Sequence, residues 1–202
     1  MPLKNIVKYT SYDSLELYHH KKVTYLGYRR ERCIYKIDKN GVSSEFVTLP
    51  DGKMFWHMTS MNDKLYVLTC DCWVLVYSLR GEQINSWQIN SIWGSIVTAG
   101  DKLVVDCDPD LIVFDEEGNE LSRLSYVNLD DDDSIFSLDS KSIIVVNVYR
   151  HNVKRIDIRT GEELWSNEGD ISEPASAAYD GHGNILVLDD VRDINVLDVS
   201  TG

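Results

Sequence analysis

The residues of this chain that could support acid–base, metal or nucleophilic chemistry are few and scattered. The histidines are His19, His20, His57, His151 and His182. They share no motif or spacing, and a metal site needs several ligands at one point, so we expect no metal. The sequence has no local signature of an activated serine, cysteine or lysine. We therefore expect no cofactor and assign no catalytic residue.

The cysteines and one acidic run have ordinary interpretations. Cys33, Cys70, Cys72 and Cys107 do not fall at a CxxC spacing, so we expect free thiols. The run Asp130–Asp133 lacks the alternating ligands and the glycine of a calcium-binding loop. We interpret it as a solvated loop, with weak calcium capture or a basic partner as the alternatives.

A second group of residues is suited to recognition. Arginine forms paired hydrogen bonds with carboxylates, and exposed tryptophan is a common anchor at interfaces. The chain places such residues in short polar segments between apolar runs. We predict as binding residues Trp73, Arg29, Arg30, Arg150, His151 and Arg192. The alternatives are a structurally packed Trp73 and solvated arginines paired with neighbouring aspartates.

Composition limits the partners. The chain has 202 residues, with 20 Lys and Arg against 33 Asp and Glu, and a formal net charge of −13. Such a field repels phosphate backbones and anionic membranes, so we expect no binding of duplex nucleic acid and no membrane association. The sequence contains no apolar run long enough to span a bilayer, and its first residues lack the apolar core of a signal peptide. We expect a soluble, acidic, cytoplasmic protein.

A repeat of about 40 residues determines which elements carry these side chains. Each copy contains a run rich in Val, Ile and Leu, then a second apolar run ending in Asp or Ser, then a glycine. These glycines are Gly41, Gly81, Gly118, Gly161 and Gly202. Continuous apolar runs are typical of strands covered on both faces, and no segment shows sustained helical periodicity.

These features predict an all-β fold, a β-propeller of about five four-stranded blades in one domain, residues 1–202. The expected blades are residues 11–49, 54–89, 92–127, 134–168 and 174–202. We expect residues 1–10 to supply the closing strand of the last blade, beside Ile194–Val199. The alternative is an excerpt from a six- or seven-bladed propeller.

Three short segments resemble known propeller families. Pro174–Asp189 and Ile112–Leu121 resemble NHL repeats, and Ile156–Trp165 is similar to blades of quinoprotein-type propellers. The Trp-Asp mark of WD repeats is absent from the sequence, and Gly-His occurs once only, at residues 181–182. Both resemblances imply the propeller fold, but propellers serve as hydrolases, lyases, ubiquitin-ligase substrate receptors, RNA binders and lectins, so neither implies one function.

In such a blade, the loop between the second and third strands shares a rim with the connection to the next blade. All the predicted binding residues fall on this rim. We therefore predict a non-catalytic scaffold that recognises a protein or peptide through these loops. The alternative is a propeller-type small-molecule or glycan-binding protein, or a hydrolase, with a site in the axial channel, so the sequence leaves enzymatic activity open.

Overall fold

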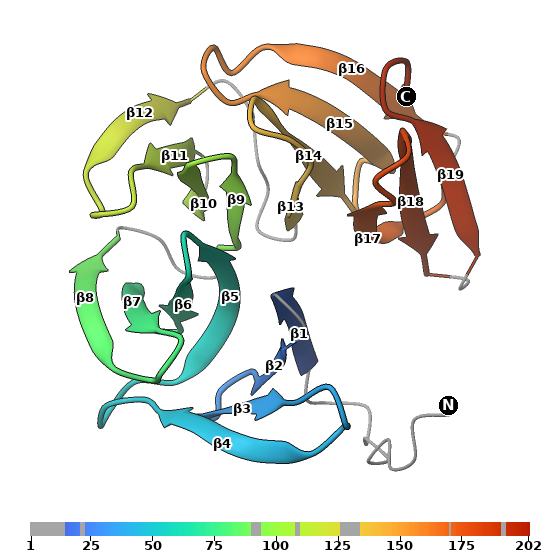
Figure 1. The fold of residues 1–202 in the computed structure, drawn as a ribbon. Coiled ribbons are helices and arrows are strands. Elements are labelled where there is room, and N and C mark those ends of the chain that lie inside the picture. The colour runs from blue at the N-terminus through green and yellow to red at the C-terminus, as the bar shows by residue number, and fades with distance from the viewer. Residues whose placement is uncertain are drawn as a thin grey trace. The chain divides into compact units, whose positions relative to one another are not determined.

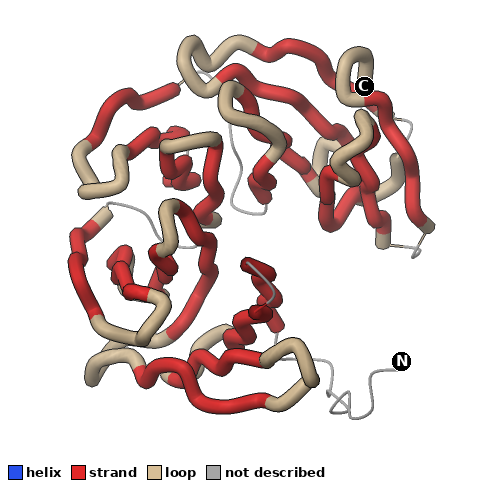
Figure 2. The backbone as a smooth tube through the Cα atoms, viewed as in Figure 1, coloured by secondary structure: helices blue, strands red, loops and turns tan. Residues whose placement is uncertain are grey.

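All secondary structure in the described residues is β-strand (Figures 1 and 2). The computed structural model describes residues 15–20, 23–89, 94–107, 110–125, 134–169, 171–190 and 193–202. The strands form five antiparallel sheets, as the repeat predicts. The chain divides into two compact units, Met1–Ile89 and Asn90–Gly202, which we describe separately as unit 1 and unit 2.

Unit 1 contains two four-stranded sheets, each a simple meander in which every strand pairs with the next. The first sheet consists of β1 (Leu15–His20), β2 (Val23–Tyr28), β3 (Cys33–Ile37) and β4 (Ser43–Thr48). The second consists of β5 (Phe55–Met61), β6 (Lys64–Thr69), β7 (Trp73–Ser78) and β8 (Gln83–Gln88).

Unit 2 contains three sheets with the same order of strands. The first consists of β9 (Ile96–Ala99), β10 (Lys102–Cys107), β11 (Asp110–Phe114) and β12 (Glu120–Leu124). The second consists of β13 (Ser134–Ser137), β14 (Ser142–Asn147), β15 (Asn152–Asp157) and β16 (Glu163–Glu168). The third consists of β17 (Pro174–Tyr179), β18 (Asn184–Asp189) and β19 (Ile194–Asp198).

The turns that follow the third strands explain the period of the sequence. The five repeated glycines all have positive φ, between 75° and 91°, which glycine adopts without steric cost. An acidic or hydroxyl side chain at the start of the turn then caps its backbone. The carboxylate of Asp115 accepts hydrogen bonds from the N–H groups of Glu117 and Asn119 at 3.0 and 2.8 Å. The combination of Asp or Ser with Gly therefore ends each third strand at a defined residue.

The cores lie between neighbouring sheets of each unit. In unit 1, Tyr25, Phe55 and Leu75 belong to one buried cluster. Gly27 allows the two sheets to approach closely, because a Cβ atom there would lie 2.5 Å from the Phe55 ring. The second strands β6, β10 and β14 are buried along almost their whole length, as their continuous apolar runs predict.

The third sheet of unit 2 departs from this pattern. Strand β18 alternates, with Val187 fully buried while Leu186 and Leu188 are exposed. On β19, Ile194 and Val196 are exposed. Among the described residues, this sheet is therefore covered on one face only, in contrast to the expectation from its apolar run. Its predicted closing strand, residues 1–10, lies outside the described residues.

Candidate binding site

Three loops of unit 1 meet at the same ends of their strands. They are the β2–β3 loop, the β4–β5 connection and the β6–β7 loop, which the repeat places on the predicted binding rim. Backbone hydrogen bonds fix them: the Arg30 N–H donates to the Phe55 carbonyl at 2.8 Å, and the Cys70 N–H donates to the Met54 carbonyl at 2.9 Å. The side chains of these loops therefore project from a rigid framework.

Arg30 lies in the β2–β3 loop and Cys72 lies in the β6–β7 loop. Both have positive φ, 66° and 67°, a backbone conformation that is costly for a residue with a side chain. Each loop contains a turn that a backbone hydrogen bond closes. The Glu31 N–H donates to the Tyr28 carbonyl, and the Cys72 N–H donates to the Thr69 carbonyl, both at 3.0 Å. Both loops therefore keep a residue with a side chain in a strained backbone conformation.

Two cations of these loops stack on aromatic rings. The Arg29 guanidinium lies 4.4 Å from the centroid of the Trp56 ring. The Lys53 ammonium lies 4.4 Å from the centroid of the Trp73 ring. Both tryptophans are half-buried. Each pair combines an apolar surface with a positive charge, an arrangement that suits both macromolecular recognition and local packing.

Lys53 also forms an ion pair with Asp71. The Thr69 hydroxyl donates to the other oxygen of that carboxylate at 2.7 Å. Partial burial of Asp71 opposes its ionisation, but the hydrogen bonds from Lys53 and Thr69 outweigh burial and lower its pKa. The β4–β5 and β6–β7 loops are thus joined through a charged pair beside Trp73.

Arg32 is tied to the start of the β4–β5 connection. Its guanidinium donates two hydrogen bonds to the Leu49 carbonyl, at 3.2 and 2.8 Å, and pairs with Asp51 at 2.7 Å. Most of the Asp51 side chain is exposed, so this pair lies in water and adds little to stability. It orients the connection.

We call Arg29, Arg30, Arg32, Lys53, Trp56, Asp71 and Trp73 the rim site. The Cys70 thiol lies beside this site, 3.5 Å from the Phe55 carbonyl oxygen, and burial raises its pKa. A protonated thiol is a poor nucleophile and a poor metal ligand. Among the described residues, no group of three or more His, Cys, Asp or Glu side chains is placed to hold a metal ion.

The remaining predicted residues belong to unit 2. Arg150 is exposed, and its backbone N–H donates to the Asn147 side chain at 2.7 Å. His151 has a structural contact, because its Nδ1 accepts the Glu173 N–H at 2.9 Å. The imidazole thereby joins the β14–β15 loop to the connection before β17. Arg192 lies outside the described residues.

The structure thus brings together Arg29, Arg30 and Trp73 in unit 1, while Arg150 and His151 lie together in unit 2. Trp73 begins β7 and packs partly against the core of unit 1. Sequence reasoning missed the part that Lys53 and Trp56 play. The repeat places Lys53 and Asp71 in loops of the same rim, so their proximity could have been predicted. Their ion pair could not, because it depends on the direction of the side chains.

No protein-family profile and no curated protein matches this sequence. Solved structures do match in fold. The WD40 β-propeller domain of Doa1 superposes with a TM-score of 0.67 at 12% identity, over 92% of this chain and 70% of that one. The fold is a β-propeller.

Two further propeller neighbours show the same likeness. BamB from Moraxella catarrhalis has a TM-score of 0.64 at 12% identity, over 92% of this chain and 58% of that one. A chain of the mitotic checkpoint complex has a TM-score of 0.70 at 9% identity, over 88% of this chain and 57% of that one. The chain thus spans little more than half the length of these two neighbours. At such identities the likeness confirms the five-bladed propeller fold and does not single out NHL proteins.

Proposed function

We propose that this propeller is a non-catalytic binding scaffold that takes a protein or peptide at the rim site. The observation that carries the proposal is the pair of cation–aromatic stacks in neighbouring loops, Arg29 on Trp56 and Lys53 on Trp73. Half-buried tryptophans supply a large apolar contact area at low entropic cost, and tryptophan and arginine are enriched among the residues that dominate binding energy.

The rigidity of the loops supports the same proposal. Backbone hydrogen bonds connect all three loops of the rim site, so a partner would not have to order them on binding. Preorganised surfaces lose less entropy on association and bind more tightly for the same contacts. Nothing in the described loops resembles a lid, which a catalytic site that excludes water would need.

The fold neighbours agree with a role in recognition. One of them is a chain of the mitotic checkpoint complex. The described residues contain no long apolar helix of the kind that crosses a membrane. We also propose a cytoplasmic location, on the composition of the chain alone.

The charges of the rim site leave apolar contact as the main source of affinity. The Lys53 ammonium and the Arg32 guanidinium are already paired with Asp71 and Asp51. The chain itself has a net charge of −13, which slows the approach of acidic partners. Affinity should therefore come mainly from contact with the two tryptophans, and arginine should add directional hydrogen bonds.

Selection from a phage-displayed random peptide library tests this proposal without a known partner. Peptides selected on the wild-type protein should lose affinity for Trp73→Ala combined with Arg29→Ala by at least about 2 kcal/mol, the scale of an anchor residue. The matched control is Leu164→Ala combined with Lys39→Ala, which removes an exposed apolar side chain and a cation elsewhere. Selected peptides that bind both variants equally, or a library that yields no binder, would contradict the proposal.

A further inference from the structure

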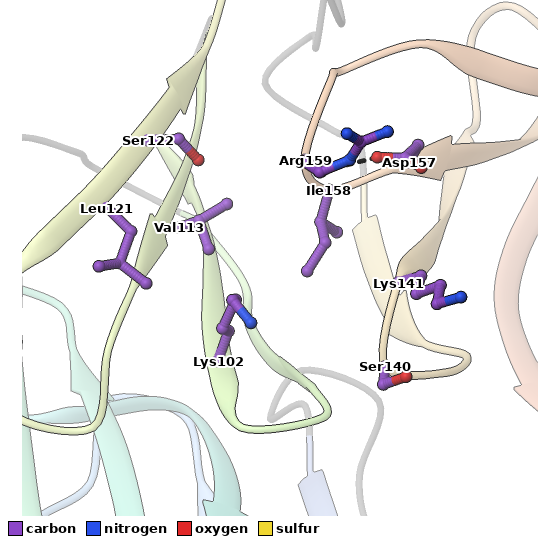
Figure 3. A pocket seen from close by; sticks show the side chains of 9 residues that line it. All are labelled: Lys102, Val113, Leu121, Ser122, Ser140, Lys141, Asp157, Ile158 and Arg159. Atoms are coloured by element: carbon purple, nitrogen blue, oxygen red, sulfur yellow. Dashed lines mark hydrogen bonds between the residues drawn. The ribbon is translucent and has the colours of Figure 1, made fainter.

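Unit 2 has a pocket of about 730 Å³ at the strand ends opposite to those that carry Arg150 and His151. Figure 3 shows its side chains, which come from the first two sheets of the unit and from the turns that follow β9, β13 and β15. Its volume falls in the range of ligand sites. The argument depends on Lys102, Lys141, Arg159, Val113, Leu121 and Ile158, and we call these residues the cationic pocket.

Close backbone packing preforms this pocket. Gly100, in the turn before β10, approaches Ser140 so closely that a Cβ atom at Gly100 would lie 2.8 Å from the Ser140 Cβ. The Ile158 N–H donates to the Lys141 carbonyl at 2.9 Å, which joins the turn after β15 to the turn before β14. The two sheets therefore hold the lining turns in fixed positions.

The lining is locally positive in an acidic protein. Lys102 pairs with Asp101 at 2.8 Å, on the exposed surface. Within the part of the chain that the structure describes, neither the Lys141 ammonium nor the Arg159 guanidinium forms an ion pair. Asp157 is the one acidic lining residue, and its carboxylate accepts the backbone N–H of Arg159 at 2.8 Å. Two cations are thus available to an anionic group.

Apolar groups stand beside these cations. Val113 and Ile158 are buried in the wall, whereas Leu121 is 52% exposed. An exposed leucine at a concave site gains free energy when an aliphatic group covers it. The occupant that satisfies both features carries a negative charge close to an aliphatic side chain.

We propose that the cationic pocket binds an acidic peptide segment, with aspartate or glutamate carboxylates at the Arg159 guanidinium and at the Lys141 ammonium and an aliphatic side chain on Leu121. A peptide segment suits the site better than a free phosphate, because only the peptide also supplies an aliphatic group to cover Leu121. Arginine also binds carboxylates with directional hydrogen bonds. The proposal goes beyond the rim site, since the pocket lies in the other unit and at the opposite strand ends from that unit's own rim residues.

Fluorescence anisotropy of a short labelled peptide of repeated Glu-Leu-Asp units, in low-salt buffer, tests the proposal. The wild-type protein should bind it, and Lys141→Glu combined with Arg159→Glu should weaken binding at least about tenfold. Lys36→Glu combined with Lys39→Glu is the matched control, because it changes the net charge equally through two exposed lysines of unit 1. Circular dichroism and urea unfolding check that every variant is folded.

A second pair of variants tests the apolar contact. Leu121→Asn should weaken the peptide severalfold, whereas Leu164→Asn, a change at a leucine of similar exposure on β16, should not. The rim variant Trp73→Ala with Arg29→Ala should bind this peptide as the wild type does, which separates the two proposals. The pocket proposal is overturned if the wild type does not bind the peptide. It is also overturned if both double charge reversals weaken peptide binding equally, or if only the rim variant loses binding.

Discussion

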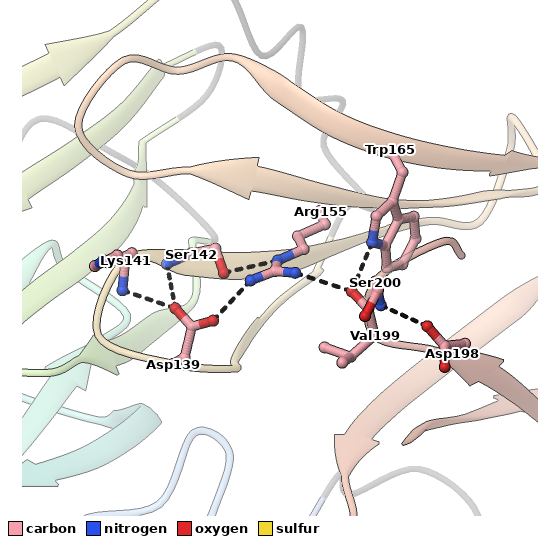
Figure 4. A network of polar contacts seen from close by, with 8 residues as sticks. All are labelled: Asp139, Lys141, Ser142, Arg155, Trp165, Asp198, Val199 and Ser200. Atoms are coloured by element: carbon pink, nitrogen blue, oxygen red, sulfur yellow. Dashed lines mark hydrogen bonds and ion pairs between the residues drawn. The ribbon is translucent and has the colours of Figure 1, made fainter. Parts of the chain in front are cut away.

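Arg155 shows how one side chain joins two sheets of unit 2. Its guanidinium donates to the Ser142 hydroxyl at 2.9 Å, to Asp139 at 2.8 Å and to the Val199 carbonyl at 2.9 Å (Figure 4). The indole N–H of Trp165 donates to the same carbonyl at 2.9 Å. The turn after β19 is therefore attached to the preceding sheet by a planar group with fixed geometry.

We predict that Arg155→Ala lowers the free energy of unfolding by about 2 kcal/mol, because partly buried acceptors lose a charged donor. Arg155→Lys should restore little of this lost free energy, since an ammonium group cannot reproduce the planar hydrogen-bond geometry of the guanidinium. Lys154→Ala, which breaks the neighbouring ion pair with Glu163, should cost less than about 1 kcal/mol. Urea unfolding measures all three, and equal losses for Arg155→Ala and Lys154→Ala would contradict the network.

The aspartates that cap the turns predict a pH dependence. A hydrogen bond from the Asn119 side chain, with further bonds from backbone N–H groups, lowers the pKa of Asp115 below the ordinary 3.8. The Asn184 side chain acts in the same way on Asp180. A carboxyl whose pKa is lower in the folded state contributes stability above its unfolded pKa and loses it as the pH falls through the folded value.

Stability should therefore decrease as the pH falls below about 4, and Asp115→Asn should make this decrease shallower. The neutral amide keeps an acceptor for the turn but no longer titrates. Unfolding midpoints measured from neutral to acidic pH test the prediction, with Asp51→Asn, at an exposed surface ion pair, as control. It fails if Asp115→Asn and the wild type have the same dependence on pH.

At the scale of the element, the last sheet offers a matched comparison of its two faces. Val187 on β18 is 0% exposed and Val196 on β19 is 61% exposed. Val187→Ala should cost about 2 kcal/mol, because it removes buried methyl groups and leaves a cavity. Val196→Ala should change stability by less than about 0.5 kcal/mol. Equal costs in urea unfolding would show that both faces are covered.

The closing strand stays a prediction. If residues 4–10 pair beside β19, deleting residues 1–10 removes a whole strand and its hydrogen bonds from the last sheet and should lower the melting temperature sharply. Substituting only the side chains of Lys4 and Lys8 by Ser should leave the melting temperature nearly unchanged. An identical melting curve after the deletion would argue against this pairing.

The strands and turns could be predicted because their signals are local. Runs of Val, Ile and Leu mark the buried second strands, and Asp followed by Gly marks the turns that end the third strands. The open face of β18 could not be predicted, since a run such as Ile185–Leu188 looks the same whether one face or both are covered. For the site, the repeat placed Arg29 and Trp73 on one rim, but cation stacking depends on rotamers set by neighbouring loops.

At the scale of the molecule, the repeated blades present loops that suit the proposed role in recognition. The fold is shared with propellers at 9–12% identity, so fold alone does not define the partner. What distinguishes this chain is where cations and aromatics gather on an acidic protein. The rim site of unit 1 has tryptophans with stacked cations. The cationic pocket of unit 2 has two cations, Lys141 and Arg159, that form no ion pair within the described residues, together with an exposed leucine.

The most direct test of the scaffold proposal is an NMR titration of the ¹⁵N-labelled protein with a peptide selected on the wild type. The account predicts that amide signals of Arg29–Arg32, Lys53 and Asp71–Trp73 shift or broaden first, together with the indole N–H signals of Trp56 and Trp73. Peptide-induced changes confined to residues outside these three loops, with both indole signals unmoved, would contradict it.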